Sequence, residues 1–264
     1  MATSDNPFRA FVDNLERHSQ LQREERQAIL ALGGHVVEIR ANQDFVRLGE
    51  RVDHACLVAQ GLVGRFGQND EGNRQITAVH IAGDMADLHS VVSPSASSAL
   101  QALTPTRIVK VQHSALKEVA RAFPMVAEAF WRQCVLDAAV LAEWTVNVGR
   151  RDARTRAAHL LCEMAWRCEA AGKASQFAFD FPVTQQHLAD MLALTPVHVN
   201  RTLKALRLDG LADVHGRKVN VLDWKALMRA GEFTPAYLLS GNEDGEEERP
   251  KLSIVSPQPQ RMEA

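Results

Sequence analysis

Residues 184–206 read TQQHLADMLALTPVHVNRTLKAL, and this stretch contains two amphipathic patterns separated by a brief turn. The first begins at Thr184, a residue type that caps helix N-termini, and continues with leucine and methionine on one face. The second begins with Thr195 and Pro196, a capping residue followed by a proline at the first helical position. The stretch therefore predicts two helices joined by a tight turn, the second over residues 196–207.

The second predicted helix separates apolar from polar side chains. Val199, Leu203 and Leu206 recur at i, i+4 and i+7 and are expected to face a core. The opposite face carries His198, Asn200, Arg201 and Lys204. In the major groove of DNA, side chains near a helix N-terminus reach base edges and cations engage phosphates. The polar face therefore predicts a DNA recognition helix.

A hairpin is predicted after this helix. Two strand-like segments, 211–214 and 219–222, flank His215-Gly216-Arg217-Lys218, which places basic residues at the tip, as in the wing of a winged helix. Between residues 196 and 218, five Lys and Arg stand against two Asp and Glu, whereas the whole chain has a formal charge of −2. Such local charge supplies the sequence-independent part of DNA affinity. The predicted DNA-contacting residues are Thr184, Thr195, Pro196, Val197, His198, Asn200, Arg201, Lys204, Arg217 and Lys218.

The N-terminal half of the chain has a different pattern. Residues 8–32 carry apolar side chains at helical spacing and predict a short helical lead-in. Residues 35–112 consist of short apolar runs with glycines between or beside them. This pattern is typical of antiparallel β-sandwiches and barrels.

A long helix is predicted between these two halves. Pro124 interrupts the helical pattern of residues 114–148, so a short helix is expected to end there and a long one to start. The long helix shows the 4-3-4-3 spacing of a coiled-coil seam, with Asp137 as its polar position. The apolar seam residues are Phe130, Cys134, Leu141, Trp144 and Val148. The stripe packs either on the β-domain or on a second copy of the chain, and the continuation of the helix towards a separate domain favours the second.

Composition and motifs exclude several classes of protein. No stretch reaches the roughly 18 apolar residues of a membrane span, and residues 1–9 lack the apolar centre of a signal peptide, so a cytoplasmic protein without membrane contact is expected. No nucleophile–base motif, P-loop, dinucleotide fingerprint or metal-ligand spacing occurs, so we predict neither an enzyme nor a bound cofactor or metal. Free thiols are predicted for the four scattered cysteines Cys56, Cys134, Cys162 and Cys168.

The run LTPVHVNRTL at residues 194–203 resembles the recognition helix of the cyclic-AMP receptor protein/fumarate-nitrate regulator (Crp/Fnr) superfamily of bacterial transcription regulators. The order of parts over residues 10–239 is similar too. The resemblance implies an α+β fold with an N-terminal antiparallel β-roll (jelly-roll, cyclic-nucleotide-binding-like) sensor domain, a long dimerisation helix and a C-terminal winged helix-turn-helix. The expected domains are residues 1–113 for the roll with its lead-in, 114–151 for the dimerisation helices and hinge, 152–240 for the winged helix, and 241–264 for a disordered acidic tail.

The resemblance also implies a function. A homodimer is expected to read a two-fold symmetric site in double-stranded DNA, with one recognition helix in each major groove. His198 and Arg201 match positions where members of the family contact base edges or backbone, and Asp152 matches the acidic hinge residue that caps the first helix of the DNA-binding domain. RNA polymerase is a further candidate partner. An alternative of another class is a sensory or protein-interaction module that does not bind DNA.

The sensor half departs from the family's cyclic-nucleotide pocket. Members that bind cyclic nucleotides carry Gly-Glu in the loop after the sixth strand region of the roll. An Arg-Ser/Thr pair follows and binds the cyclic phosphate. Here the loop begins Gly83-Asp84, and residues 93–103 contain no arginine. Because a buried phosphate without a cation is poorly stabilised, this departure from the family predicts an input other than a cyclic nucleotide.

Three alternatives for the input remain open. Asp84, Asp87 and His89 form the candidate pocket for an unidentified small effector. Haem is a second alternative, because histidines and a soft cysteine ligand occur in the roll, although scattered histidines are usually solvated or hydrogen-bonded; the residues are His80, His89, His113 and Cys56. The family's oxygen-sensing iron–sulfur centre is not expected, since no cysteine precedes Cys56. The third alternative is a regulator that is competent for DNA binding without any effector.

Overall fold

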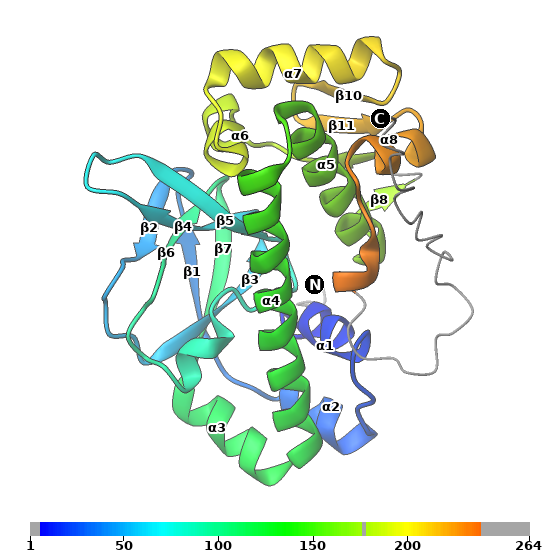
Figure 1. The fold of residues 1–264 in the computed structure, drawn as a ribbon. Coiled ribbons are helices and arrows are strands. Elements are labelled where there is room, and N and C mark those ends of the chain that lie inside the picture. The colour runs from blue at the N-terminus through cyan, green and yellow to red at the C-terminus, as the bar shows by residue number, and fades with distance from the viewer. Residues whose placement is uncertain (1–5, 176–177, 239–264) are drawn as a thin grey trace, which may run out of the picture.

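The computed structural model of the chain describes residues 6–175 and 178–238 (Figure 1). Two short helices and a β-roll come first, a long helix follows them, and a helical unit with a small sheet completes the described chain. This is the predicted α+β arrangement. The predicted acidic tail at residues 241–264 lies outside the described residues.

The roll consists of two antiparallel sheets with the strand orders β1-β7-β3 and β2-β6-β4-β5. Its apolar core lies between the sheets and includes Val46, Leu100 and Ile108. Burial is continuous along β6 and over four consecutive residues of β3 and of β4, because both faces of these strands are covered by other parts of the chain. The strands are β1 (His35–Ile39), β2 (Gln43–Val46), β3 (His54–Gln60), β4 (Val63–Gln68), β5 (Arg74–His80), β6 (Ala99–Ala102) and β7 (Thr106–Gln112).

Two short helices precede the roll, as the lead-in pattern predicted. They are α1 (Arg9–Glu16) and α2 (Arg23–Leu30), and a 3₁₀ turn η1 (Leu88–Val91) follows β5. The buried face of α1 packs in one apolar cluster with roll residues and with the long helix. The loop after β5 approaches α1 so closely that a Cβ at Gly83, where φ is +105°, would lie 3.1 Å from the Ala10 carbonyl oxygen. Glycine there allows both the backbone conformation and the contact.

The helix α3 (His113–Ala122) ends before Phe123, and α4 (Pro124–Arg150) starts with proline at its first position, as predicted. Two residues of the predicted seam are nevertheless covered within the chain itself. Phe130 and Trp144 are only 7% and 4% exposed, because the chain itself covers them. Phe130 lies 6.1 Å from Phe11 of α1 between ring centroids, and Trp144 packs in the cluster of the C-terminal unit.

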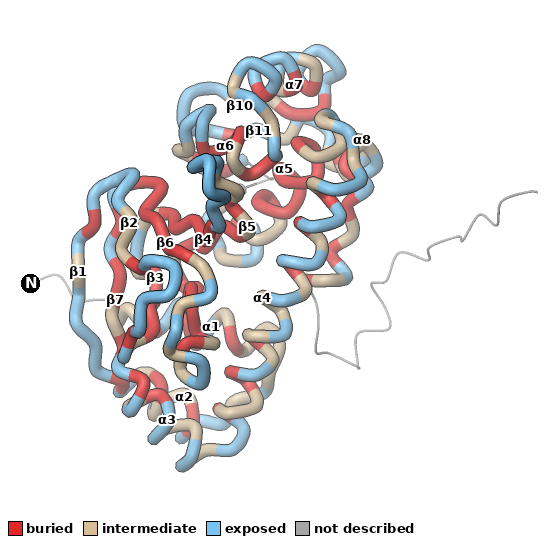
Figure 2. Tube along the Cα trace, turned by 60° about the vertical axis from the view of Figure 1, so that its left-hand side comes forward, coloured by how far each residue is buried: buried red, intermediate tan, exposed pale blue. Residues whose placement is uncertain are grey.

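The free apolar face of α4 lies beside the predicted seam. Figure 2 shows exposed and half-buried segments alternating along the helix. Of the other predicted seam residues, Leu141 is 42% exposed, whereas Cys134 and Val148 are half-buried. The exposed apolar residues between positions 131 and 146, here called the α4 stripe, are Trp131, Val135, Ala138, Leu141, Ala142 and Val146. Four of them, at 131, 135, 138 and 142, repeat the 4-3-4 spacing one position later than predicted.

The C-terminal unit is a winged helix. Its elements are α5 (Ala153–Ala170), β8 (Ala174–Ser175), β9 (Ala178–Asp180), α6 (Gln185–Leu192), α7 (Pro196–Leu208), β10 (Ala212–His215), β11 (Lys218–Val221), α8 (Trp224–Ala230) and the 3₁₀ turn η2 (Pro235–Leu238). The predicted hairpin is β10–β11, and it belongs to a four-stranded sheet of order β10-β11-β9-β8. The predicted cap at Asp152 is present, since its carboxylate accepts from the Thr155 amide at 2.8 Å.

None of the helices within residues 6–175 and 178–238 is both long enough and apolar enough to cross a lipid bilayer.

Candidate nucleic-acid interface

The helix α7 lies at one end of the molecule, with its predicted polar face uncovered (Figure 1). Val199 and Leu206 are fully buried and Leu203 is half-buried, so the apolar face points inward as predicted. Val197 is 64% exposed beside the polar face. The exposed polar residues are His198, Asn200, Arg201 and Lys204.

The two helices of the motif begin at capped residues. The Thr184 hydroxyl accepts from the His187 amide at 3.1 Å, and the Thr195 hydroxyl accepts from the His198 amide at 3.3 Å. Both threonines are exposed, and Pro196 is half-buried at the first position of α7. The caps fix where α6 and α7 start, because they satisfy amides that have no partner inside the helix.

Local charge on this face is not neutralised by the chain. Within the described residues, Arg201 and Lys204 make no ion pair, while Arg207 at the far end of α7 lies 3.8 Å from Asp213. In the wing, Gly216 has a φ of +61° and forms the turn between β10 and β11, which leaves Arg217 and Lys218 exposed. Free guanidinium and ammonium groups of this kind suit contacts with phosphates and with guanine edges.

A cleft of about 640 Å³ adjoins the polar face of α7. Its lining joins Thr195, His198 and Arg201 to the first turn of α5, including Ala153 and Arg154. Arg154 was not predicted as a site residue, although its position two residues after the cap Asp152 was a usable signal. Its guanidinium already binds Asp209 at 2.7 Å. The cleft is open to solvent and its lining includes Arg154 and Arg201, which suits a phosphate backbone better than an enclosed small molecule.

The three residues of the candidate effector pocket make contacts with different elements. Asp84 accepts from the Ile81 amide at 2.8 Å and binds Arg167 at 2.8 Å. Asp87 accepts from the Cys56 amide at 2.6 Å, and burial raises its pKa. His89 is half-buried, and burial lowers its pKa. The described structure gives these side chains no shared partner.

Arg65 is a cation of the roll interior that the sequence did not reveal, because it lies far in sequence from the loop segment 93–103, which contains no arginine. Arg65 of β4 donates to the Ala86 carbonyl at 2.5 Å and to Asp137 of α4 at 2.9 Å. Burial raises the pKa of Asp137, and the neighbouring Arg65 opposes that shift. Asp137, predicted as the polar position of a seam between two chains, is therefore bound inside its own chain.

The residues considered for haem do not converge on one point. The Nε2 atom of His113 lies 2.8 Å from the Ser90 hydroxyl, and Cys56 is buried in the roll core. His80 is also buried, and burial together with Arg65 holds its pKa well below its ordinary value. Residues 6–175 and 178–238 contain no group of three His, Cys, Asp or Glu side chains arranged to hold a metal ion.

Comparison with known proteins connects both halves of the fold to described families. A Crp-like helix-turn-helix domain matches residues 155–230, and a cyclic nucleotide-binding domain matches residues 36–123.

Curated relatives match most of the chain. The transcriptional activator protein FnrL of Cereibacter sphaeroides is 26% identical over 197 residues, which cover 72% of this chain and 77% of FnrL. The nitrogen fixation regulation protein FixK of Azorhizobium caulinodans is 27% identical over 204 residues, covering 77% of this chain and 81% of FixK.

A solved structure, FixK2 from Bradyrhizobium japonicum, is similar with a TM-score of 0.70 and 25% identity, over 77% of this chain and all of that one. A CooA variant from Carboxydothermus hydrogenoformans shares the fold at 18% identity and a TM-score of 0.61, over 75% of this chain and 88% of that one.

Proposed function

We propose that this chain, which belongs to the Crp/Fnr family of transcription regulators, acts as a homodimer that reads a two-fold symmetric DNA site with one α7 helix in each major groove. Its helix-turn-helix domain is of the Crp type and binds DNA, and the chain is not an enzyme. We also propose that the protein is located in the cytoplasm and that RNA polymerase is a further partner.

The uncovered polar face of α7 carries this proposal. We propose that His198, Asn200 and Arg201 contact base edges, because they occupy the exposed N-terminal half of α7. Arginine suits guanine and asparagine suits adenine, since each can bond a base edge through two atoms. The remaining contacts are to the phosphate backbone, from Thr184, Thr195, Pro196, Val197, Lys204, Arg217 and Lys218, with Arg154 as an addition from the cleft.

The α4 stripe supports the homodimer. Large side chains such as Trp131, 68% exposed, are rarely left open along a helix of a monomer, and contiguous apolar patches mark interaction sites. The 4-3-4 spacing matches a partner helix of the same kind. We propose that two α4 helices pack along the stripe, while Asp152 caps the hinge between α4 and α5. The domain limits expected from the sequence remain part of this proposal.

The internal contacts of the roll support an input other than a cyclic nucleotide. Arg65 is bound by Asp137, and Asp84 is bound by Arg167, so neither is free for a ligand in this arrangement. Because these side chains are already paired, we propose that the protein binds DNA without an added effector.

Selection of random-sequence DNA by the purified full-length protein, without added effector, tests the proposal. Enrichment of one palindromic motif is expected. Arg201→Ala should weaken binding by about 1–3 kcal/mol and relax the preference at one position of each half-site. Arg207→Ala is the matched control, because it removes the same residue type from the same helix at the end away from the cleft. A selected motif without two-fold symmetry would refute the homodimer, and unchanged selection by Arg201→Ala would refute the assigned recognition face.

A further inference from the structure

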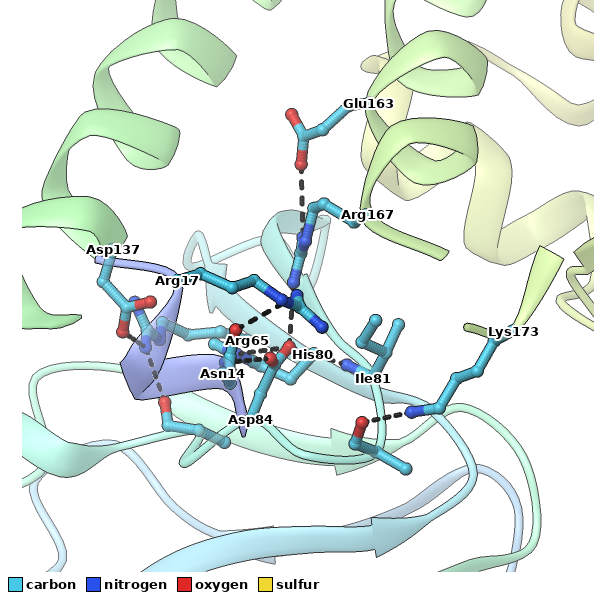
Figure 3. Close-up of polar contacts among 12 residues, drawn as sticks. Asn14, Arg17, Arg65, His80, Ile81, Asp84, Asp137, Glu163, Arg167 and Lys173 are labelled. Carbon is cyan, nitrogen blue, oxygen red and sulfur yellow. Dashed lines mark hydrogen bonds and ion pairs between the residues drawn. The ribbon is translucent and has the colours of Figure 1, made fainter. Parts of the chain in front are cut away.

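The roll and the winged helix are joined by a chain of buried charged groups centred on Arg167 (Figure 3). Arg167 lies in the last turn of α5, and its guanidinium binds two carboxylates. It donates to Asp84 of the roll at 2.8 Å and to Glu163 of its own helix at 3.3 Å. The side chains of Arg167, Asp84 and Glu163 are 17%, 12% and 0% exposed. A pair so shielded from water is far less screened than one on the surface.

The roll holds Asp84 in place for this contact. Besides Arg167, the carboxylate accepts from the Ile81 amide at 2.8 Å and from the Asn14 side chain at 3.1 Å. The preceding Gly83 has a φ of +105°, which lets α1 pack directly on the loop. Asp84 is therefore a fixed acceptor at the edge of the roll, aimed at α5.

The other carboxylate links Arg167 to the long helix. Glu163 accepts from the Trp144 indole of α4 at 2.8 Å and from the Tyr237 hydroxyl of η2 at 2.9 Å. Arg167 thus lies between the roll on one side and, through Glu163, the α4 helix on the other. The contacts that hold the Arg167 side chain therefore also set the direction of α5 relative to the roll and to α4.

Neighbouring contacts cross the same junction. Arg17, the residue after α1, donates to the Ala170 carbonyl at the end of α5 at 2.6 Å, and Lys173 donates to the Ala82 carbonyl of the roll. Each joins a charged donor of one unit to a neutral carbonyl of the other. Because a carbonyl pairs less strongly with a cation than a carboxylate does, Arg167–Asp84 is the strongest of these contacts.

The helix-turn-helix itself also touches the roll, on the side away from the recognition face. The Nε2 atom of His187 in α6 lies 2.8 Å from the Asn42 side-chain oxygen, and Gln75 of β5 donates to the Met191 carbonyl at 3.1 Å. The outward side chains of α7 stay exposed. The roll therefore holds the winged helix through α5 and α6 and leaves the recognition face free.

We propose that Arg167 and Asp84 are positioning residues for DNA binding: their ion pair orients the winged helix on the roll so that both recognition helices of a dimer reach their half-sites together. This inference rests on the proposed homodimer. One helix can bind one half-site in any orientation of its domain, whereas the full site requires two helices about 34–36 Å apart. A domain that reorients freely is competent for only part of the time, and its apparent affinity for the full site falls by that fraction.

The test compares affinities of the full-length protein for its selected two-fold site and for one half of that site. Arg167→Met and Asp84→Asn are each expected to weaken full-site binding about tenfold or more and to change half-site binding less than about twofold. Arg167→Lys, which keeps the charge, should recover part of the loss. The double variant should be no weaker than the worse single one, because both substitutions break the same contact. Arg107→Met is the control, since its 2.6 Å pair with Glu38 lies within the roll.

Full-site affinity that stays within twofold in Arg167→Met overturns the inference. An equal loss on full and half sites overturns it too, because that result means a misfolded domain. If the wild-type protein gains nothing from a full site, the homodimer proposal fails instead. Spin labels at Glu118→Cys and Lys225→Cys, in a Cys134→Ser background, then decide the orienting role. A broader distance distribution in Arg167→Met supports it, and an unchanged one overturns it.

Discussion

The buried carboxylate of Glu163 gives a quantitative prediction for stability. In Glu163→Ala, the Trp144 indole loses its acceptor and Arg167 keeps Asp84. The Tyr237 hydroxyl loses the carboxylate but lies 3.2 Å from Nε2 of His159, which can accept from it instead. A buried donor left unpaired costs about 1–3 kcal/mol, and exchange of a charged acceptor for a neutral one costs about 1 kcal/mol, so the free energy of unfolding should fall by about 2–4 kcal/mol. Glu163→Gln keeps an amide oxygen for both donors and loses only the charge that faces Arg167. Its expected cost is about 1–2 kcal/mol, the difference between a charged and a neutral hydrogen bond.

Urea unfolding of the full-length protein measures both values. Tryptophan fluorescence and far-ultraviolet circular dichroism should be followed at one fixed protein concentration, because the stability of a dimer depends on concentration. Tyr237→Phe supplies the matched background. In it the hydroxyl that exchanges its acceptor is already gone, so Glu163→Ala should cost about 1 kcal/mol less than in the wild type. A loss below about 1 kcal/mol for Glu163→Ala, or equal losses for Ala and Gln, would refute this account of the hydrogen bonds.

Three further predictions concern the stripe, a histidine and a thiol. Trp131→Glu should convert the homodimer to monomers in light scattering, because it places a charge in the apolar stripe; an unchanged mass would exclude the stripe as the interface. The buried His80 has a pKa held well below its ordinary value, first by burial and then by Arg65, so the folded state binds fewer protons than the unfolded state. Stability should fall as the pH drops below about 6.5, less steeply in His80→Gln, and equal slopes in urea unfolding would contradict this. Burial raises the pKa of Cys134 to about 11, so a thiol reagent at neutral pH should label this half-buried cysteine slowly and all four cysteines only in urea; rapid labelling of the native protein would contradict the buried thiols.

Local chemistry explains what the sequence could predict. The caps at Thr184, Thr195 and Asp152 act within three residues of themselves, so their signals are contained in a short stretch. The helix α7 was expected over residues 196–207 and spans Pro196–Leu208. The start of α4 follows from Pro124 alone, since proline fixes the first helical position.

Long-range packing explains what the sequence could not predict. The strands β8 and β9 are only two and three residues long, and they exist because β9 pairs with β11 far along the chain. Periodicity on α4 showed which residues are apolar but not which of them the rest of the chain covers. Phe130 is covered by α1, and Trp144 by the C-terminal unit, so the free stripe lies one position later.

The candidate effector residues illustrate the same limit. Asp84 was predicted as a candidate effector residue from its loop alone, and its partner Arg167 is 83 positions away. Arg65 and Asp137 are 72 positions apart. A carboxylate in a loop looks the same in sequence whether it faces a ligand or another part of the chain.

The ion pair between Arg65 and Asp137 determines what a ligand of the roll interior would have to do. A buried arginine needs a counter-ion, which either a soluble anion or a side chain of the protein can supply. Here the long helix supplies it as a covalently attached carboxylate. A soluble anion that bound Arg65 would therefore have to displace Asp137 and leave that carboxylate without its cation. Such an exchange would act directly on α4, the helix that connects the roll to the winged helix.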